Sequence, residues 1–260
     1  MKVLIVDPVH RVLIDKLEGK GFVTDYQPQI TANQIIREIE KYDGLVIRSK
    51  MVIDRDTIDR GVNLKFIGRV GSGMENIDVR HAREKNILCL NSPEGNRDAV
   101  GEHALGLLLA LANRIPVANA QVKSGIWDRE ANRGLEIKGK TVGLIGYGNT
   151  GSAFAEKLQG LGVNTIAYDK YKFNYGRSQV KEKTMDALFD EADVLSLHVP
   201  LTGETHHLVN DRFLQRFRKS ILLINTSRGE VVHTTDLVKN LNSGKVQAAA
   251  LDVLELESKT

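Results

Sequence analysis

Short apolar runs alternate with amphipathic stretches along most of the chain, which has 260 residues. Each apolar run has the length of a short strand, and most are followed by residues with helical spacing. This alternation is typical of parallel α/β architecture, in which helices connect the strands of a sheet. We expect strands at residues 2–6, 22–25, 44–47, 66–69 and 87–90 in the first part, and at residues 141–145, 164–168, 194–198, 221–225 and 248–253 in the second. The pattern predicts an α/β fold with two doubly wound parallel-sheet domains.

One amphipathic segment of the first part has clear helical features. Residues 31–41 place Ile35, Ile36 and Ile39 on one face, at the spacing of a helix that packs on a sheet. Thr31 stands directly before this segment, and its hydroxyl can accept a hydrogen bond from the first turn. We therefore expect a capped helix here.

A second helical segment separates the two domains. Residues 91–93 read Asn-Ser-Pro and break the first α/β pattern. A long helix is expected at residues 97–114, and it is apolar on most of its circumference from residue 104 to residue 112. Such a helix is typically buried between domains or at a subunit contact. We place the domain boundary before it, which gives a first domain of residues 1–93 and a second of residues 94–260.

Composition narrows the class of protein. Hydrophobic residues make up 42% of the chain and charged residues 27%, as in ordinary globular proteins. The single cysteine, Cys89, cannot form an internal disulfide. No signal segment is expected before the apolar run at residues 3–6, and the apolar stretch at residues 104–112 is far shorter than the roughly 20 residues of a membrane span. We expect a cytoplasmic protein without a membrane segment.

The charge pattern gives no reason to expect nucleic-acid binding. The net charge is +3, from 36 basic and 33 acidic residues that are scattered along the chain. Nucleic-acid sites need a clustered basic stripe and aromatic platforms, and only 5% of the residues are aromatic. No set of His, Cys, Asp and Glu residues has metal-ligand spacing, so we expect no metal site.

A glycine-rich motif follows the first strand expected in the second domain. The strand at residues 141–145 runs into the motif at residues 146–151, Gly-Tyr-Gly-Asn-Thr-Gly, and a helical pattern comes next. In this context Gly146 permits a tight turn, Gly148 lets the backbone approach a pyrophosphate, and Gly151 lets helix and strand pack closely. The helix N-terminus would offer free N–H groups to the phosphates. The motif predicts an NAD(H) site.

An acidic residue strengthens this interpretation. Asp169 ends the next expected strand, 18 residues after Gly151 (169 − 151 = 18). A carboxylate at this position accepts hydrogen bonds from the adenosine ribose and repels a 2′-phosphate, which favours NAD over NADP. The adjacent Lys170 slightly weakens that preference. If Asp169 merely ended a strand, it would have no such role.

Arg228 directly follows the apolar strand at residues 221–225. Ligands of open parallel sheets bind beyond the carboxyl ends of the strands. An arginine there can hold a carboxylate with a bidentate fork and polarise a neighbouring carbonyl. Its position alone is equally compatible with a surface arginine that caps a turn.

Further segments occur in a recognisable order. They are VIRS at residues 46–49, GRVGSGMENID at 68–78, NSPEGN at 91–96, EHA at 102–104, LHVPLT at 197–202, NTSRG at 225–229 and LDVLELE at 251–257. With the glycine motif, they cover nearly the whole chain. The sequence resembles the D-isomer-specific 2-hydroxyacid dehydrogenases, especially the D-3-phosphoglycerate dehydrogenase branch. The resemblance implies a flavodoxin-like substrate domain, a Rossmann NAD-binding domain and a homodimer that forms through the NAD-binding domain.

The resemblance also implies the cofactor residues. They are Gly146, Gly148, Asn149, Thr150, Gly151, Asp169, Thr226, Ser227, Arg228 and Asp252. Among these, Thr226 and Ser227 would line the nicotinamide site, and Asp252 would bind the nicotinamide carboxamide. Arg228 would also be catalytic, because it would bind the substrate carboxylate and orient the C2 oxygen. The second catalytic residue would be Glu257, the acid that pairs with a histidine.

The resemblance also implies the substrate residues. They are Arg48, Ser49, Ser72, Gly73 and Asn96. Backbone N–H groups of Ser72 and Gly73 would contact the carboxylate, while the others would line the far end of the pocket. An arginine at position 48 suits a phosphate or a second carboxylate, so oxidation of 3-phosphoglycerate to 3-phosphohydroxypyruvate is one reading. Arg48 could equally be a surface residue at the end of a strand.

One expected group is missing. The family's catalytic histidine follows the acid, whereas no histidine follows Glu257 in this sequence. We expect none of the seven histidines present to replace it, so this chain would be inactive by itself and would belong to a longer one. The function expected is an NAD-dependent oxidoreductase of D-2-hydroxy acids and 2-oxo acids. The alternative is a corepressor-like protein that senses NAD(H) without turnover.

Overall fold

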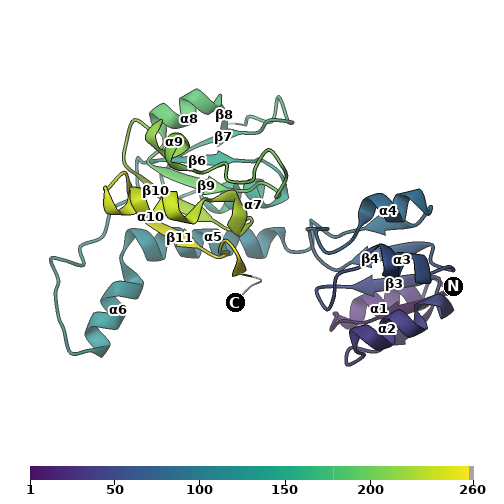
Figure 1. Ribbon diagram of the computed structural model, residues 1–260. Helices are drawn as coiled ribbons and strands as arrows, with labels where there is room; N and C mark the ends of the chain where they lie inside the picture. The colour runs from purple at the N-terminus through teal and green to yellow at the C-terminus, as the bar shows by residue number, and fades with distance from the viewer. Residues whose placement is uncertain (178, 258–260) are drawn as a thin grey trace. The chain divides into compact units, whose positions relative to one another are not determined.

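The computed structural model describes residues 1–177 and 179–257 (Figure 1). Contacts between Cα atoms divide the chain into an N-terminal unit, Met1–Asn96, and a C-terminal unit, Arg97–Thr260. Each unit contains one sheet, and every strand pairing within the two sheets is parallel. The predicted α/β class with two parallel sheets is confirmed.

The N-terminal unit has five strands in the order β2-β1-β3-β4-β5, which is the flavodoxin-like order. The strands are β1 Lys2–Ile5, β2 Val23–Tyr26, β3 Gly44–Ile47, β4 Phe66–Arg69 and β5 Leu88–Leu90. The helices are α1 Arg11–Glu18, α2 Ala32–Glu38, α3 Arg55–Arg60 and α4 Val79–Glu84, with a short 3-10 helix at Ile39–Lys41. Thr31 forms a capping box with Gln34 at the start of α2, as its position predicted.

Alternating side chains of the central strands enter two separate cores. Leu4 and Leu45 pack with Ile35 and Ile39 on one face, while Val3 packs toward α1 on the other. Because successive strand residues point to opposite faces, a strand covered on both faces is apolar at every position. This explains why β3 is buried from end to end.

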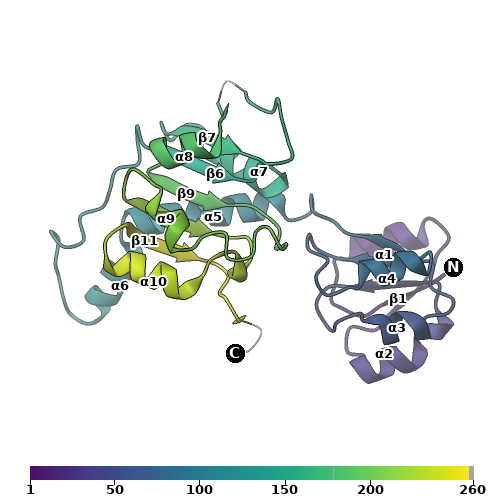
Figure 2. The same ribbon diagram turned by 45° about the horizontal axis from the view of Figure 1, so that its top comes forward.

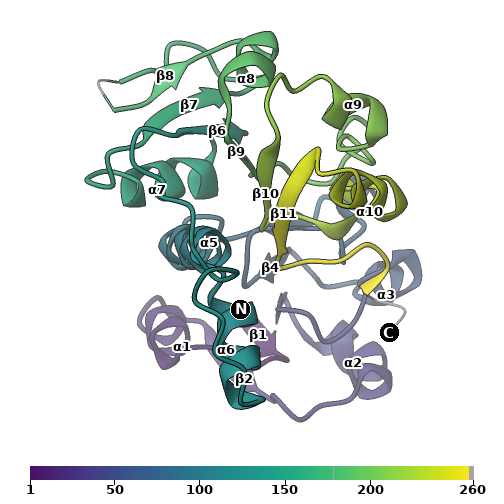
Figure 3. The same ribbon diagram turned by 90° about the vertical axis from the view of Figure 1, so that its left-hand side faces the viewer.

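The C-terminal unit has six strands in the order β11-β10-β9-β6-β7-β8 (Figure 3), which is the Rossmann order with its reversal between β6 and β9. The strands are β6 Thr141–Ile145, β7 Asn164–Tyr168, β8 Lys181–Glu182, β9 Val194–Leu197, β10 Ile221–Asn225 and β11 Val246–Leu251. The helices are α5 Arg97–Ala112, α6 Ile115–Lys123, α7 Asn149–Lys157, α8 Met185–Glu191, α9 Asp211–Gln215 and α10 Thr234–Asn242, with a 3-10 helix at Gly229–Val231.

Helices cover both faces of this second sheet (Figure 3). On one face, α5 packs against α7, and Leu108 and Phe154 from these helices meet Leu144 of β6. On the other face, α8, α9 and α10 bury Leu188 and Leu237, among others, against β9 and β10. The sheet therefore has two apolar layers, and its functional groups lie at the strand ends.

The long helix expected at residues 97–114 is shorter than predicted and covered on one side. It ends at Ala112, because Arg114 has a φ of 51° in the left-handed region, and α6 continues at a bend of 60°. The residues buried in α5 form a single stripe: Gly101, Ala104, Leu108 and Ala112. Contacts within this unit therefore bury only part of the apolar surface of α5. None of the described helices by itself has the length and apolar character of a membrane span, although α5 and α6 pass that test when joined.

Several elements of the C-terminal unit differ from expectation. Helix α7 begins inside the glycine motif, at Asn149, because Gly148 serves as its N-cap. Strand β11 begins at Val246, two residues earlier than expected. The short strand β8 was not predicted, since its two residues, Lys181 and Glu182, are charged and exposed.

The contact between α5 and α7 gives a stability prediction. A Cβ at Gly101 would lie 2.9 Å from the carbonyl carbon of Ala153 and 3.0 Å from the nitrogen of Phe154, which are backbone atoms that cannot move aside. Gly101→Ala should lower the free energy of unfolding by about 1–3 kcal/mol in a urea titration. Gly106→Ala is the matched control on the same helix, because no atom lies within 4 Å of its Cβ position. It should raise stability by roughly 0.5–1 kcal/mol. Equal effects of both changes would contradict the tight helix contact.

Candidate active site

The glycine turn after β6 is shaped by two close backbone approaches. Gly146 has a φ of 92°, and its N–H donates to the carbonyl of Tyr168 at 2.8 Å. A Cβ at Gly146 would overlap the carbonyl of His198, and one at Gly151 would overlap the carbonyl of Gly146. Since neither position can accept a side chain, both glycines are required by the packing itself.

Gly148 serves a different purpose from its two neighbours in the motif. No heavy atom lies within 4 Å of the position that its Cβ would take. It is also the N-cap of α7 and provides no side chain to satisfy the helix N-terminus. Asn149 and Thr150 form the first turn of that helix. This open cradle at a helix N-terminus fits the pyrophosphate of a dinucleotide.

Asp169 reaches back from the end of β7 to the glycine turn. One carboxylate oxygen accepts the N–H of Tyr147 at 2.8 Å. The other accepts the N–H groups of Tyr171 and Lys172 at 2.9 and 3.0 Å. These bonds fix the carboxylate beside the turn, which is where the adenosine ribose of a bound dinucleotide would lie.

His198 packs against the same turn. The residue is 8% exposed, its ring packs on the ring of Phe154 with centroids 5.6 Å apart, and its Nε2 lies 2.9 Å from Ser196 Oγ. Burial lowers the pKa of His198 to about 4, because the interior disfavours the charged ring. At neutral pH His198 is an uncharged packing group of the cofactor unit.

Asn225, at the end of β10, organises the segment that carries Arg228. Its side-chain oxygen accepts the N–H and hydroxyl of Ser227 at 3.0 and 2.7 Å, and its amide donates to the carbonyl of Arg228 at 2.9 Å. Asn225 is almost completely buried. The guanidinium of Arg228 donates to the carbonyl of Ser227 at 2.7 Å. Arg228 thus stands on a turn that a buried amide holds in place.

The acid expected to be catalytic lies on the neighbouring segment. Strands β10 and β11 pair in parallel, and the N–H of Asp252 donates to the carbonyl of Asn225 at 3.0 Å. A Cβ at Gly229 would overlap the carbonyl of Leu254, so the turn after Arg228 lies against the segment that leads to Glu257. One oxygen of the Glu257 carboxylate accepts the N–H of Leu254 at 3.0 Å. Arg228, Asp252 and Glu257 therefore follow two adjacent strands at one edge of the sheet.

Thr226 and Asp252 are two residues expected at the nicotinamide end of the site. The hydroxyl oxygen of Thr226 is buried and has no hydrogen-bond partner within the described part of the chain. Such an orphaned group indicates a partner from a ligand. Asp252 lies 3.0 Å from Nε2 of His103, and both side chains are about half exposed. His103 thus lies on the accessible side of α5.

Glu255 ties together the loop after β9 and the start of α10. Its carboxylate accepts the N–H of Thr234 at 2.8 Å and lies 2.6 Å from His207. The bond from the Thr234 N–H, with the His207 contact, lowers the pKa of Glu255 to about 2. This carboxylate is therefore a structural anchor, two residues before Glu257.

In the N-terminal unit, a buried carboxylate positions the loop after β3. Asp7 accepts the N–H groups of Arg48, Ser49 and Lys50 at 2.6, 3.1 and 3.3 Å. Asp7 is 7% exposed, whereas Arg48 and Ser49 are exposed. The backbone at positions 48–50 is thus fixed while the side chain of Arg48 can reach a ligand.

Arg48 lines a pocket of about 470 Å³ at the carboxyl ends of four strands. Its lining residues follow β1, β3, β4 and β5, and are Pro8, Val9, His10, Arg48, Arg69, Val70, Gly71, Ser92, Gly95 and Asn96. Three of them have basic side chains, which suits an anionic ligand. A Cβ at position 71 would overlap the guanidinium of Arg69. The absence of a side chain at Gly71 therefore lets Arg69 lie there.

Two other predicted substrate residues lie beside this pocket. Ser72 donates its hydroxyl to the side-chain oxygen of Asn96 at 2.7 Å, and Asn91 donates to the carbonyl of Ser72 at 2.6 Å. Gly73 continues the same loop. The structure therefore brings the Ser72–Gly73 loop next to Asn96 within one unit.

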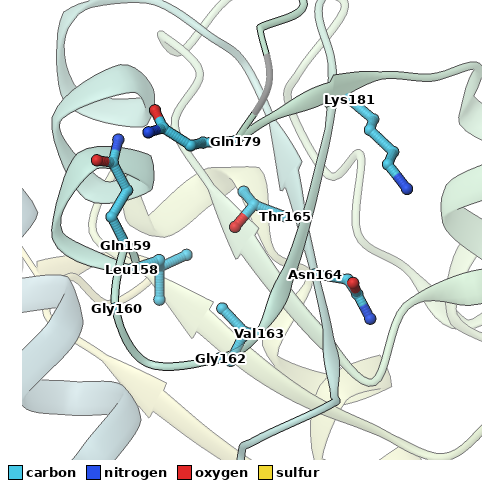
Figure 4. Close-up of a pocket in the computed structure, with 9 residues that line it drawn as sticks. All are labelled: Leu158, Gln159, Gly160, Gly162, Val163, Asn164, Thr165, Gln179 and Lys181. Atoms are coloured by element: carbon cyan, nitrogen blue, oxygen red, sulfur yellow. The ribbon is translucent and has the colours of Figure 1, made fainter.

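A pocket of about 450 Å³ at the opposite edge of the second sheet is unrelated to this chemistry (Figure 4). It lies at the amino end of β7 and the C-terminal end of α7, between Leu158 and Thr165. Figure 4 shows Gln159 and Gln179 on one side and Lys181 directed away from them. Its lining contains no carboxylate, and ligands of such sheets bind at the carboxyl edge.

Sequence reasoning missed several residues that shape the site. His10 and Arg69 line the basic pocket of the N-terminal unit, and Asn225 holds the Arg228 turn. Each follows or ends a predicted strand, which was a usable signal for Arg69 and Asn225 in particular. Within the described residues, no group of three or more His, Cys, Asp and Glu residues could hold a metal ion.

Comparison with known proteins identifies the family. The sequence profile of the NAD binding domain of the D-isomer specific 2-hydroxyacid dehydrogenases matches residues 105–260. The chain belongs to this family. The predicted resemblance is thereby confirmed, and with it the presence of an NAD-binding domain whose glycine cradle, Asp169 and Thr226 fit that cofactor.

Individual relatives agree with this assignment. The chain is 37% identical over 259 residues to a D-3-phosphoglycerate dehydrogenase of Archaeoglobus fulgidus, covering 99% of this chain and 49% of that protein. It is 38% identical over 259 residues to a hydroxypyruvate reductase of Thermotoga maritima, covering 100% of this chain and 84% of that protein. A glyoxylate reductase from Paecilomyes thermophila has a similar structure, with a TM-score of 0.88, 25% identity, and coverage of 99% of this chain and 83% of the other. The chain spans about half the length of the D-3-phosphoglycerate dehydrogenases that it matches.

The buried imidazole of His198 makes stability depend on pH. Because its pKa is about 4 in the folded chain and 6.5 for an imidazole exposed to water, the unfolded chain binds a proton that the folded chain excludes. This contribution is fully present above pH 6.5 and is lost as pH falls toward 4. Between those limits it should remove up to about 3 kcal/mol from the free energy of unfolding, measured by urea titration. His198→Gln should flatten this dependence. An equal slope in both proteins would contradict it.

Proposed function

We propose that this dehydrogenase transfers hydride between NAD and the C2 carbon of D-2-hydroxy acids or 2-oxo acids. The observation that carries the proposal is the placement of Arg228 and Glu257 after two adjacent strands of the sheet that also bears the glycine cradle. A cation that binds a carboxylate and an acid that supports proton transfer are the groups that this reaction needs beside the nicotinamide.

The cofactor would be held by the residues that the motif indicated. The N–H groups at the start of α7, near Asn149 and Thr150, face the pyrophosphate, and Asp169 takes the adenosine ribose. Thr226 offers its buried hydroxyl to the nicotinamide end, with Ser227 beside it and Asp252 toward the carboxamide. When bound, NAD supplies the hydride acceptor, and the residues of the chain orient the cofactor in the site.

Arg228 would position the substrate. Its planar guanidinium can bind the carboxylate with two parallel hydrogen bonds and polarise the C2 oxygen. Polarisation of a carbonyl favours the arrival of hydride at its carbon. Because Asn225 fixes the Arg228 turn, the guanidinium needs little reordering when a substrate binds.

Glu257 would act on the proton of the C2 oxygen through an imidazole. A carboxylate within hydrogen-bond distance favours the charged form of an imidazole and keeps it able to donate near neutral pH. Such general acid catalysis typically contributes about 10²–10⁴ in rate. We assign Glu257 this pairing role, and the buried His198 is unsuited to be its partner.

The basic pocket of the N-terminal unit favours a substrate that carries a second negative group. Arg48, Arg69 and His10 line it, and the loop of Ser72 and Gly73 lies next to it through Asn96. A phosphate suits such a cluster of basic groups. We therefore propose 3-phosphoglycerate and 3-phosphohydroxypyruvate as the substrate pair, with the N-terminal unit as the substrate domain. The reaction would take place in the cytoplasm.

We also propose a homodimer that forms through the NAD-binding domain. Helix α6 and the segment after it project from the rest of the C-terminal unit (Figures 1 and 2), and no residue of α6 is buried. The exposed apolar side chains of this arm are Ile115, Val117, Val122, Ile126, Trp127 and Leu135. Exposed apolar groups gathered in this way mark association sites. A second copy of the chain would cover them.

The substrate role of Arg228 can be tested without turnover. Oxamate mimics a 2-oxo acid but does not accept hydride, so we expect it to bind the NADH complex and change nicotinamide fluorescence. Arg228→Gln should still bind NADH through the glycine cradle and Asp169, and its affinity for oxamate should fall at least about tenfold, because the charged fork is lost. Arg228→Lys should keep part of the affinity.

Gly148→Val is the matched control for this experiment. Its side chain enters open space, so folding should be unchanged, but it fills the cradle and should abolish NADH binding. Oxamate affinity that is equal in Arg228→Gln and the unmutated chain would overturn the substrate role. Absence of NADH binding in the unmutated chain would overturn the proposed function.

The dimer is tested by the mass in solution. Trp127 is 83% exposed in the single chain, and aromatic anchors dominate the energy of interfaces. Trp127→Ser should raise the dimer dissociation constant at least about tenfold in sedimentation equilibrium. Phe173→Ser is the control, because Phe173 is 73% exposed but lies outside the arm. A mass of 28.9 kDa at every concentration of the unmutated chain would contradict the dimer.

A further inference from the structure

Two side chains that follow Asp169 converge on one carboxylate from another loop. The ammonium of Lys170 lies 2.8 Å from Oε2 of Glu204, and the hydroxyl of Tyr171 donates to the same oxygen at 2.6 Å. The Lys170 ammonium also lies 5.6 Å from the centre of the Tyr171 ring. We call these three residues the clasp.

The clasp connects the loops of two strands that are not neighbours. Lys170 and Tyr171 follow β7, Glu204 belongs to the loop after β9, and β6 with its glycine turn lies between these strands. The adenosine half of a dinucleotide lies at this carboxyl edge, beside the strand-order reversal. The clasp therefore joins the two sides of the adenosine site.

Glu204 is presented by a fixed turn. The N–H of Thr202 donates to the hydroxyl oxygen of Thr205 at 2.8 Å, and that hydroxyl donates to the carbonyl of Pro200 at 2.6 Å. Glu204 lies between Thr202 and Thr205 in the sequence. These hydrogen bonds therefore fix the backbone from which the Glu204 side chain extends to Lys170.

Asp169 has limited capacity left for a ribose. A carboxylate offers about four acceptor sites, and the N–H groups of Tyr147, Tyr171 and Lys172 use three of them. A single further hydrogen bond, from one ribose hydroxyl, can be accepted without a change. A 2′-phosphate offers no such donor when ionised and would meet a negative charge.

Charged groups of both signs lie around this position. Asp169 and Glu204 are negative, Lys170 is positive, and Lys172 donates its ammonium to the carbonyl of Tyr147 at 3.2 Å. The Glu204 carboxylate raises the pKa of Lys170, and the Lys170 ammonium lowers the pKa of Glu204, so both stay charged near neutral pH. A phosphate monoester would add nearly two negative charges beside the carboxylates of Asp169 and Glu204.

We propose that Glu204 is a specificity-determining residue of the cofactor site, which excludes NADP by engaging Lys170. In the clasp the ammonium of Lys170, the residue that follows Asp169, is already paired. Without Glu204, Lys170 would be available to a 2′-phosphate. This inference rests on the proposed NAD(H) function of the site and adds a second discriminating group to Asp169.

The test compares the affinities for NADH and NADPH by fluorescence titration. Glu204→Gln should improve NADPH binding about three- to tenfold and change NADH binding much less, because one exposed charge is removed near the phosphate. The gain should shrink at high salt, where exposed charges are screened. Tyr171→Phe, which removes only one bond of the clasp, should give a smaller gain.

Two variants decide the cause of any gain. In the double variant Lys170→Met/Glu204→Gln the gain should disappear, since the released ammonium is gone. Glu191→Gln is the matched control, because Glu191 forms an exposed ion pair of 3.0 Å with Lys183 in the same unit, and it should leave the NADH to NADPH ratio unchanged.

The outcomes separate the two proposals. An unchanged ratio in Glu204→Gln, or a gain that persists without Lys170, overturns the role of Glu204 while NADH binding by the unmutated chain preserves the cofactor assignment. If the unmutated chain binds neither dinucleotide, the proposed function itself is wrong.

Discussion

The C-terminal unit depends on the close packing of three backbone segments where its strand order reverses. The turn at Gly146 lies against the carbonyl of His198, and Gly151 lies against Gly146 itself. This packing starts α7 directly at the edge of the sheet, with its N–H groups at the strand ends. The ring of His198 is buried beside this turn, and its burial lowers the pKa of the imidazole. The phosphate cradle is therefore a consequence of how the strands pack, not an addition to a finished fold.

The strands could be predicted more accurately than the helices, for a physical reason. Central strands such as β3 and β10 are buried on both faces, so each appears in the sequence as an unbroken apolar run with sharp ends. The start of α7 was misplaced because its N-cap is a glycine inside the motif. The end of α5 is set by the left-handed conformation of Arg114, which no apolar pattern announces.

The same distinction applies to the site. The glycines could be predicted because tight backbone approaches exclude side chains and leave a fixed spacing in the sequence. Glu204 could not, because its role comes from contacts that depend on the folded arrangement of loops. The contact of His103 with Asp252 likewise depends on the folded arrangement, because the two residues lie far apart in the sequence. Sequence motifs thus record backbone constraints better than side-chain networks.

Backbone contacts, more than side chains, set the relation between Arg228 and Glu257. The parallel pairing of β10 and β11 brings the two segments out of the sheet together, and the close approach of Gly229 to Leu254 fixes their separation. The segment then turns through Leu256, whose φ of 65° costs about 1–2 kcal/mol for a residue with a side chain. The bond from the Leu254 N–H to the Glu257 carboxylate offsets part of this cost and closes the turn. An imidazole that paired with the Glu257 carboxylate would therefore compete with the N–H of Leu254 for it. The pairing of Glu257 and the conformation of its segment are thus linked.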